Sequence, residues 1–175
     1  MNSTKTKKLI FASLFAALTC AATLIVKIPT PIGGYVHAGD TVVLLSALFL
    51  GGIYGAPAAG IGSAMADIIS GYFIYAPGTL VIKAVVAIVA AVLINRKLGK
   101  NLFVKSVIAG CIAEILMVAG YLFYDAVVLG FGAGAVADVP ANLIQGAFGA
   151  IAAAALYSAL NSSEYVRRVM RDIKE

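Results

Sequence analysis

The stretch LIFASLFAALTCAATLIV at residues 9–26 is followed at once by KIPTPIGGYVHAGD at residues 27–40, and this contrast decides the fold. The first segment has no charged residue and is close to the roughly 20 apolar residues that a helix needs to cross a bilayer. The second is polar, is interrupted by Pro and Gly, and holds the chain's single histidine, His37. We therefore expect a membrane helix that leads into a loop, and this loop is a candidate lid over a binding site.

Apolar runs of this kind recur along the whole chain. The composition is 62% hydrophobic and 12% charged, which is about half the charged fraction of a soluble domain. A soluble helical core would need polar helix faces, and the runs have none. The sequence predicts a single all-α integral membrane domain over residues 1–175, a compact bundle of about six transmembrane helices, with about five as the alternative. The predicted helices span residues 8–27, 41–53, 56–74, 78–95, 102–123 and 138–160, with an outer lid loop at 27–40 and a cytoplasmic tail at 161–175.

The basic residues indicate the orientation. All except Lys27 and Lys83 fall in three groups: before the first helix, between the fourth and fifth, and after the last. These groups are Lys5, Lys7 and Lys8; Arg96, Lys97, Lys100 and Lys105; and Arg167, Arg168, Arg171 and Lys174. The positive-inside rule places them in the cytoplasm, so both termini are predicted to be cytoplasmic, and the even spacing favours six crossings. The pI of about 9.3 then reflects topology and anionic lipid, and no nucleic-acid partner is expected.

Charged residues inside the predicted helices are candidate functional groups, because a charge at the bilayer centre costs about 2.5–3.5 kcal/mol on insertion scales. Asp67 and Lys83 lie near the outer ends of consecutive helices and are predicted to form an ion pair. That pair would either fix the register of two helices or serve the function, and the sequence leaves both open.

Other polar residues share the outer half of the membrane. Asp138, a candidate helix N-cap, Asn142, Gln145 and Gly149 form one stripe, which must face protein or water. The candidate substrate-binding residues are Tyr35, His37, Lys83, Glu114, Tyr121, Asn142 and Gln145. Rings that stack and amides that pair donors with acceptors suit a small, polar, planar heterocycle. No Arg lies in this half, which disfavours a phosphorylated ligand.

The sequence does not favour an enzymatic function. Ser63 in GIGSAM has no base spaced to activate it, since the single histidine lies on the loop. The chain has one histidine and no closely spaced cysteines, so its sequence contains no spacing typical of a metal site. Cys20 and Cys111 are interpreted as small apolar residues inside helices. No Walker A motif is present. No catalytic residue, metal or cofactor is therefore predicted, and uphill transport would draw energy from a partner or an ion gradient.

Small residues spaced by four mark the first helix. Ala12 and Ala16 form one such pair, and Ala17 and Ala21 form a second. This spacing lets helix backbones approach closely in a membrane. The pairs either pack within the bundle or dock another protein.

Two segments carry a resemblance to a known family. Residues 34–83, GYVHAGDTVVLLSALFLGGIYGAPAAGIGSAMADIISGYFIYAPGTLVIK, resemble the S components of energy-coupling factor (ECF) vitamin transporters. The HxGD piece ending at Asp40 and the Gly- and Ala-rich helix ending in Asp67 are the most specific parts. Residues 139–149, VPANLIQGAFG, resemble the sixth helix of the same family. The similarity is strongest to the riboflavin-type S components, including members predicted to carry hydroxymethylpyrimidine or pyridoxine.

This resemblance implies high-affinity capture of a small water-soluble vitamin or precursor for ATP-driven uptake, with hydroxymethylpyrimidine or pyridoxine favoured and riboflavin next. The loop between the first two helices would close over the vitamin. The implied partners are a transmembrane coupling subunit and two cytoplasmic ATPase subunits. The coupling subunit would contact an AxxxA pattern, which Ala12 and Ala16 match, with Ala17 and Ala21 as a second register. The implied location is a prokaryotic cell membrane, crossed several times.

Two other functions remain open at this point. The first is a stand-alone proton-coupled secondary transporter of a small heterocycle, in which Asp67, Lys83 and Glu114 form a proton relay. The second is a purely structural membrane subunit. Uptake by the isolated chain under a pH gradient would favour the first, and a purified protein without any bound small molecule would favour the second.

Overall fold

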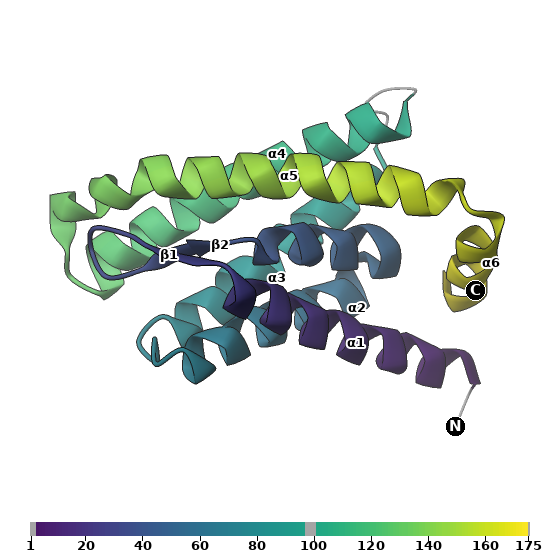
Figure 1. Cartoon of the computed structure of the whole chain (residues 1–175), viewed down its shortest axis with the longest axis horizontal. Coiled ribbons are helices and arrows are strands. Elements are labelled where there is room, and N and C mark those ends of the chain that lie inside the picture. The colour runs from purple at the N-terminus through teal and green to yellow at the C-terminus, as the bar shows by residue number, and fades with distance from the viewer. Residues whose placement is uncertain (1–2, 97–100, 175) are drawn as a thin grey trace.

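The computed structural model describes residues 3–96 and 101–174 of the 175-residue chain. Lys97 and Lys100, two residues of the predicted basic groups, lie outside the described residues. The elements follow one another from purple to yellow in Figure 1. They are α1 (Ser3–Ile25), β1 (Lys27–Pro29), β2 (Tyr35–His37), α2 (Gly39–Ile69), α3 (Ala76–Ile94), α4 (Leu102–Phe123), the π-helix η1 (Tyr124–Val128), the 3-10 helix η2 (Gly132–Asp138), α5 (Val139–Ser162) and α6 (Glu164–Lys174).

The longest helix, α2, is broken at Gly51. This residue has φ 74° and ψ −178°, a conformation that only glycine adopts readily. Across this break, the hydroxyl of Ser46 donates a hydrogen bond to the carbonyl oxygen of Gly55 over 3.1 Å. In a straight helix these two residues would lie about 13 Å apart, so the chain reverses here. The second segment accordingly runs back toward the strands (Figure 1).

This break corrects the predicted bounds of two helices. The expected helices at 41–53 and 56–74 are two segments of one element, and the chain turns at Gly51 instead of after residue 53. The second segment ends at Ile69, and residues 70–75 form a loop before α3. Hydropathy alone does not locate such a turn, because the glycines at 51 and 52 interrupt no apolar run.

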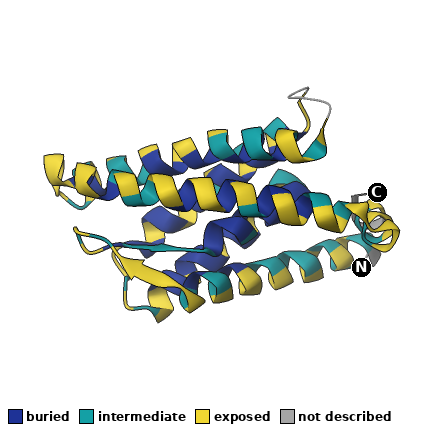
Figure 2. Cartoon of the chain, turned by 45° about the horizontal axis from the view of Figure 1, so that its top comes forward, coloured by how far each residue is buried: buried dark blue, intermediate teal, exposed yellow. Residues whose placement is uncertain are grey.

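The centre of the bundle is the first segment of α2, where Val43, Leu44 and Ala47 are almost fully buried. Figure 2 shows buried residues concentrated on the inner helices and exposed residues on the outer faces. Glycine permits the closest helix contacts: a Cβ at Gly60 would collide with the Leu80 backbone, and one at Gly62 with the Ala16 carbonyl. Small residues thus bring α2 against both α3 and α1.

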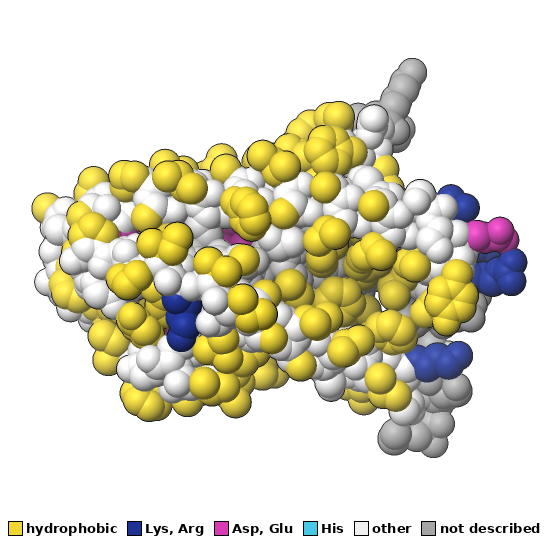
Figure 3. Space-filling model, in the orientation of Figure 1, with side chains coloured by type: hydrophobic (Ala, Val, Ile, Leu, Met, Phe, Trp, Pro, Cys, Tyr) yellow, Lys and Arg dark blue, Asp and Glu magenta, His cyan; other side chains and the backbone are white. Residues whose placement is uncertain are grey.

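The outer surface is apolar. Large side chains stand open on it, including Ile53 and Ile25, which are 83% and 80% exposed, and Figure 3 shows hydrophobic side chains over most of the visible face. Among the described residues, five helices are long and apolar enough to cross a membrane, with α2 counted once. An exposed apolar surface of this extent is what a bilayer covers. The chain is therefore an all-helical membrane protein in its main architecture.

The two ends of the molecule differ. Both termini lie at one end, together with α6, and the two strands lie at the other (Figure 1). The strands form an antiparallel hairpin in which Lys27 pairs with His37 and Pro29 with Tyr35. The segment predicted as a lid loop is thus a β-hairpin, named the lid hairpin below (residues 27–37). The predicted tail at 161–175 contains the end of α5 and the separate helix α6.

Candidate substrate-binding site

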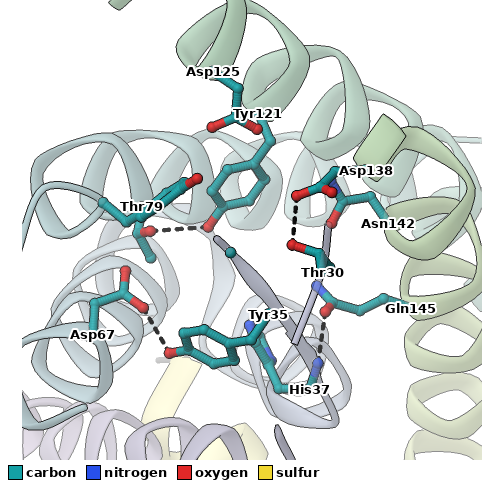
Figure 4. Close-up of a pocket in the computed structure, with 12 residues that line it drawn as sticks. Thr30, Tyr35, His37, Asp67, Thr79, Tyr121, Asp125, Asp138, Asn142 and Gln145 are labelled. Carbon is teal, nitrogen blue, oxygen red and sulfur yellow. Dashed lines mark hydrogen bonds between the residues drawn. The ribbon is translucent and has the colours of Figure 1, made fainter. Parts of the chain in front are cut away.

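A small cavity of about 30 Å³ lies at the hairpin end of the bundle. Its walls come from the lid hairpin, the second segment of α2, the start of α3, the α4–η1 junction and the start of α5 (Figure 4). The lining residues are Thr30, Gly34, Tyr35, His37, Asp67, Tyr75, Thr79, Tyr121, Asp125, Asp138, Asn142 and Gln145. Elements distant in the sequence therefore meet at one site lined by many polar side chains.

Asp138 fastens the turn of the lid hairpin. Its Oδ2 accepts a hydrogen bond from the Thr30 hydroxyl over 2.5 Å, and its Oδ1 accepts one from the Ile32 amide over 3.4 Å. Asp138 does sit at the N-terminal boundary of α5, with a proline in the first turn, but it makes no capping hydrogen bond. The predicted N-cap role is therefore wrong, because the hairpin turn occupies the carboxylate.

Gln145 links the lid hairpin to the protein interior. Its Oε1 accepts a hydrogen bond from the His37 amide, and its Nε2 donates one to Asp40 Oδ2, each over 2.7 Å. The amide of Gln145 thus accepts a hydrogen bond from the lid hairpin and donates one to a buried carboxylate. This contact and the Asp138 contact fasten the hairpin at two points, from residues on or next to α5.

Lys83 pairs with Asp40 and not with Asp67, so the predicted Asp67–Lys83 ion pair is wrong. The Lys83 Nζ lies 2.5 Å from Asp40 Oδ1 and 5.3 Å from the centre of the Tyr121 ring. The reversal at Gly51 explains the difference, because it brings the start of α2 into the core beside α3. Lys83 is buried beneath the cavity and is not among its lining residues.

Asp67 instead faces the lid hairpin, and its Oδ1 accepts a hydrogen bond from the Tyr35 hydroxyl over 2.6 Å. Burial and this carboxylate raise the pKa of Tyr35, which keeps its hydroxyl protonated and able to donate. The Tyr35 ring packs on Tyr72 and His37, with ring centres 4.6 and 5.5 Å apart. On the opposite side, the Tyr121 hydroxyl donates to Thr79 Oγ1 over 3.0 Å.

His37 is partly buried and neutral. Its Nδ1 accepts a hydrogen bond from the Gly39 amide over 3.0 Å, which requires that nitrogen to be unprotonated. Burial lowers the pKa of His37 to about 4; nearby Asp40 opposes this shift and Lys83 supports it. The residue therefore lines the cavity as an uncharged group at neutral pH.

Glu114 is the one predicted site residue besides Lys83 that does not line the cavity. It is 2% exposed, and neither carboxylate oxygen has a hydrogen-bond partner among the described residues. Gly146 of α5 lies against its side chain, as Gly149 lies against Asp40. Both carboxylates thus lie below the cavity floor formed in part by Gln145.

Five lining residues were not among the candidate substrate-binding residues: Thr30, Tyr75, Thr79, Asp125 and Asp138. Asp138 did stand out by its helical spacing, as a member of the polar stripe and as a candidate cap. Asp125 lies two residues beyond the predicted helix at 102–123, within the π-helix η1. In the described part of the chain, no group of His, Cys, Asp and Glu has the arrangement of a metal site.

Comparisons with known proteins agree with this arrangement. The family model described as the S component of the ECF-type riboflavin transporter matches residues 3–162. An uncharacterized Pyrococcus woesei protein, from a region beyond the 3′ end of gap, is 35% identical over 130 residues, 74% of this chain and 84% of that protein. A solved structure of the S component of a bacterial ECF transporter has a TM-score of 0.67, with 20% identity, covering 90% of this chain and 97% of that one. The chain therefore belongs to the ECF-type riboflavin transporter S-component family, as a substrate-binding transport subunit and not an enzyme.

Proposed function

We propose that this S component captures a small water-soluble vitamin or vitamin precursor beneath the lid hairpin for ATP-driven uptake, with hydroxymethylpyrimidine or pyridoxine favoured and riboflavin next. The observation that carries the proposal is the lid itself. The hairpin closes a polar, tyrosine-walled cavity and is fastened to Asp138 and Gln145 by hydrogen bonds that can open without unfolding a helix. A ligand would enter when these contacts release and would be held when they form again.

The size of the cavity supports a single-ring ligand. A volume of about 30 Å³ has room for only about two water molecules, so any vitamin requires the lid and side chains to move. A pyrimidine or pyridine ring demands less movement than the fused rings and ribityl chain of riboflavin. The amides of Asn142 and Gln145 offer paired donors and acceptors, which match a ring nitrogen beside an amino or hydroxymethyl group.

We further propose six membrane crossings with both termini in the cytoplasm of a prokaryotic cell. Three observations support this topology. The two segments of α2 run in opposite directions, both termini lie at the end away from the lid, and the basic residues of α1 and α6 gather at that same end (Figures 1 and 3). The positive-inside rule then turns the lid and the cavity outward.

The proposed partners are a transmembrane coupling subunit and two cytoplasmic ATPase subunits. α1 is the least buried of the five long helices, which leaves most of its surface free for a partner. On α1, Ser13, Ala17 and Ala21 are exposed, whereas Ala12 and Ala16 are half-buried. The exposed register, Ala17 and Ala21, is therefore the better docking stripe, although the Ala12 and Ala16 register matches the family pattern equally well.

Native mass spectrometry of the purified chain tests the proposed function. We expect a bound small molecule with the mass of hydroxymethylpyrimidine, pyridoxine or riboflavin, and calorimetric titration with the same compounds should give saturable binding. A chain that copurifies with none of them and binds none in titration would contradict the proposal. Uptake by the isolated chain in proteoliposomes under a pH gradient, without ATPase subunits, would favour the proton-coupled transporter instead.

A further inference from the structure

The cavity is lined by acidic residues without matching cations. Three carboxylates, Asp67, Asp125 and Asp138, face it, and no Lys or Arg is among the described residues that line it. The nearby Asp40 is already paired with Lys83 below the floor. The other basic group at this end, Lys27, donates to the Ser70 hydroxyl over 2.7 Å and lies exposed at the rim. The described lining therefore holds three carboxyl groups and no basic side chain of its own.

Two of these carboxylates hold free acceptor atoms. Both oxygens of Asp138 accept hydrogen bonds from the hairpin turn. By contrast, Asp67 Oδ2 and Asp125 Oδ1 are buried and have no hydrogen-bond partner among the described residues, and these side chains belong to residues only 5% and 2% exposed. A buried acceptor without a donor is costly, and a buried charge without a partner more so. Both atoms belong to cavity-lining side chains and can be satisfied from within it (Figure 4).

The other lining residues do not compensate this charge. His37 is neutral, because burial lowers its pKa to about 4. Burial and the nearby carboxylates of Asp125 and Asp138 raise the pKa of Tyr75, whose hydroxyl also has no partner among the described residues. An aromatic face attracts a cation within about 6 Å of the ring centre. Lys27 already lies 5.7 Å from the centre of the Tyr35 ring and Lys83 lies 5.3 Å from that of Tyr121, whereas the Tyr75 ring lines the cavity with no such contact among the described residues. Acidic acceptors beside tyrosine rings favour a positively charged ligand over a neutral one.

We propose that the ligand of this site carries a positive charge, as an ammonium group on a single nitrogen heterocycle, and that Asp67 and Asp125 accept its hydrogen bonds. The proposal rests on the proposed function, because it specifies the chemical class of the captured vitamin precursor. Charge-assisted hydrogen bonds are stronger than neutral ones, so the charged group should raise the affinity above that of a neutral analogue with the same ring.

Two pairs of compounds that differ in one group test the charge. Pyridoxamine carries an aminomethyl group where pyridoxine carries hydroxymethyl, and the aminomethyl analogue of hydroxymethylpyrimidine forms the second pair. Calorimetric titration of the purified full-length chain at neutral pH gives each Kd. We expect the amine of at least one pair to bind at least tenfold more tightly than its alcohol.

Variants then test the assignment of the carboxylates. Asp67→Asn and Asp125→Asn keep the shape and remove the charge, so each should lower the amine preference, the ratio of the alcohol Kd to the amine Kd, severalfold. Saturable alcohol binding, at whatever affinity, reports that each variant is folded. Glu164→Gln, on the exposed α6 at the far end, is the matched control and should retain the full preference.

The outcomes separate the two proposals. Alcohols that bind as tightly as the amines overturn the charged-ligand inference and leave the vitamin-capture function standing. A preference for amines that survives in both Asn variants overturns the roles of Asp67 and Asp125. Failure of all four compounds and of riboflavin to bind the unmodified chain overturns the proposed vitamin class and the inference with it.

Discussion

The Lys83 Nζ lies 2.5 Å from Asp40 Oδ1, and both side chains are completely excluded from solvent. The second oxygen of the Asp40 carboxylate accepts from Gln145, whose own oxygen accepts from the backbone of His37. An ion pair between α2 and α3 is thereby connected through α5 to the lid hairpin. The position of the lid consequently depends on a charged pair that lies beneath the cavity and not in its wall.

Replacement of Lys83 by Met should destabilise the protein strongly, because it leaves the Asp40 carboxylate buried without its cation. Loss of one partner of a buried pair typically costs about 3–5 kcal/mol. The double variant Asp40→Asn with Lys83→Met removes both charges and should regain a large part of this loss. Thermal unfolding in detergent measures both effects. A double variant no more stable than Lys83→Met alone would show that the pairing is not what stabilises this region.

Thr30→Val should loosen the lid hairpin without altering its shape. The substitution removes the hydroxyl that donates to Asp138, and a hydrogen bond to a charged group contributes about 1.5–3 kcal/mol. Amide hydrogen exchange in residues 27–37 should accelerate tenfold or more, because the hairpin opens more often. Thr41→Val is the matched control, since that hydroxyl is buried and has no partner among the described residues. Equal exchange in the two variants would argue against the Asp138 contact as a fastening point.

Gln145→Ala should shorten the time for which a vitamin stays bound. The change removes the link between the His37 backbone and Asp40, and effects of this kind fall mainly on dissociation rates. We expect hydroxymethylpyrimidine to dissociate at least tenfold faster, with a much smaller change in its association rate, in stopped-flow or rapid-filtration measurements. Asn95→Ala, which removes an amide at the opposite end of α3, should change neither rate. An unchanged dissociation rate would show that this link does not retain the ligand.

The sequence predicted the membrane bundle and much of the cavity, because both follow from local patterns. Apolar runs define the helices, and the spacing of Asn142 and Gln145 on α5, with Asp138 just before it, predicts that all three face the same site. The partner of Lys83 could not be predicted in this way, since it depends on the reversal at Gly51, where the hydropathy does not change. The lid strands were missed because each has only three residues, and because Pro29 ends the first strand and Pro31 lies in the turn. The position of a residue along a predicted helix also gives only an approximate depth in the membrane. It therefore did not distinguish Glu114, which lies below the cavity, from Tyr121, which lines it.

The lid hairpin should weaken in mild acid. In the closed hairpin His37 has a pKa of about 4, whereas in an opened one it returns toward its ordinary value of 6.5. Opening therefore takes up a proton between these values, so the closed form is fully stable above about pH 6.5 and loses stability as the pH falls toward 4. Hydrogen exchange of residues 27–37, compared at each pH with His37→Asn, measures this. Asn can still accept a hydrogen bond from the Gly39 amide but does not titrate. In the His37→Asn variant, hydrogen exchange of the lid hairpin should therefore not accelerate in this way as the pH falls. Parallel profiles for the two proteins would contradict the role of His37.

Ala17→Trp should separate ligand capture from transport. Ala17 is exposed on α1 within the small-residue stripe that we propose as the docking surface, so a bulky ring there would block close approach of a partner helix. Binding of hydroxymethylpyrimidine should stay within about twofold of the unmodified chain, because α1 contributes no residue to the cavity. ATP-dependent uptake by the complete complex in proteoliposomes should fall by tenfold or more. Ile115→Trp, on an exposed face of α4, is the control for adding a ring to the lipid-facing surface and should preserve uptake. Normal uptake with Ala17→Trp, together with loss of uptake for Ala16→Trp, would move the docking stripe to the register of Ala12 and Ala16.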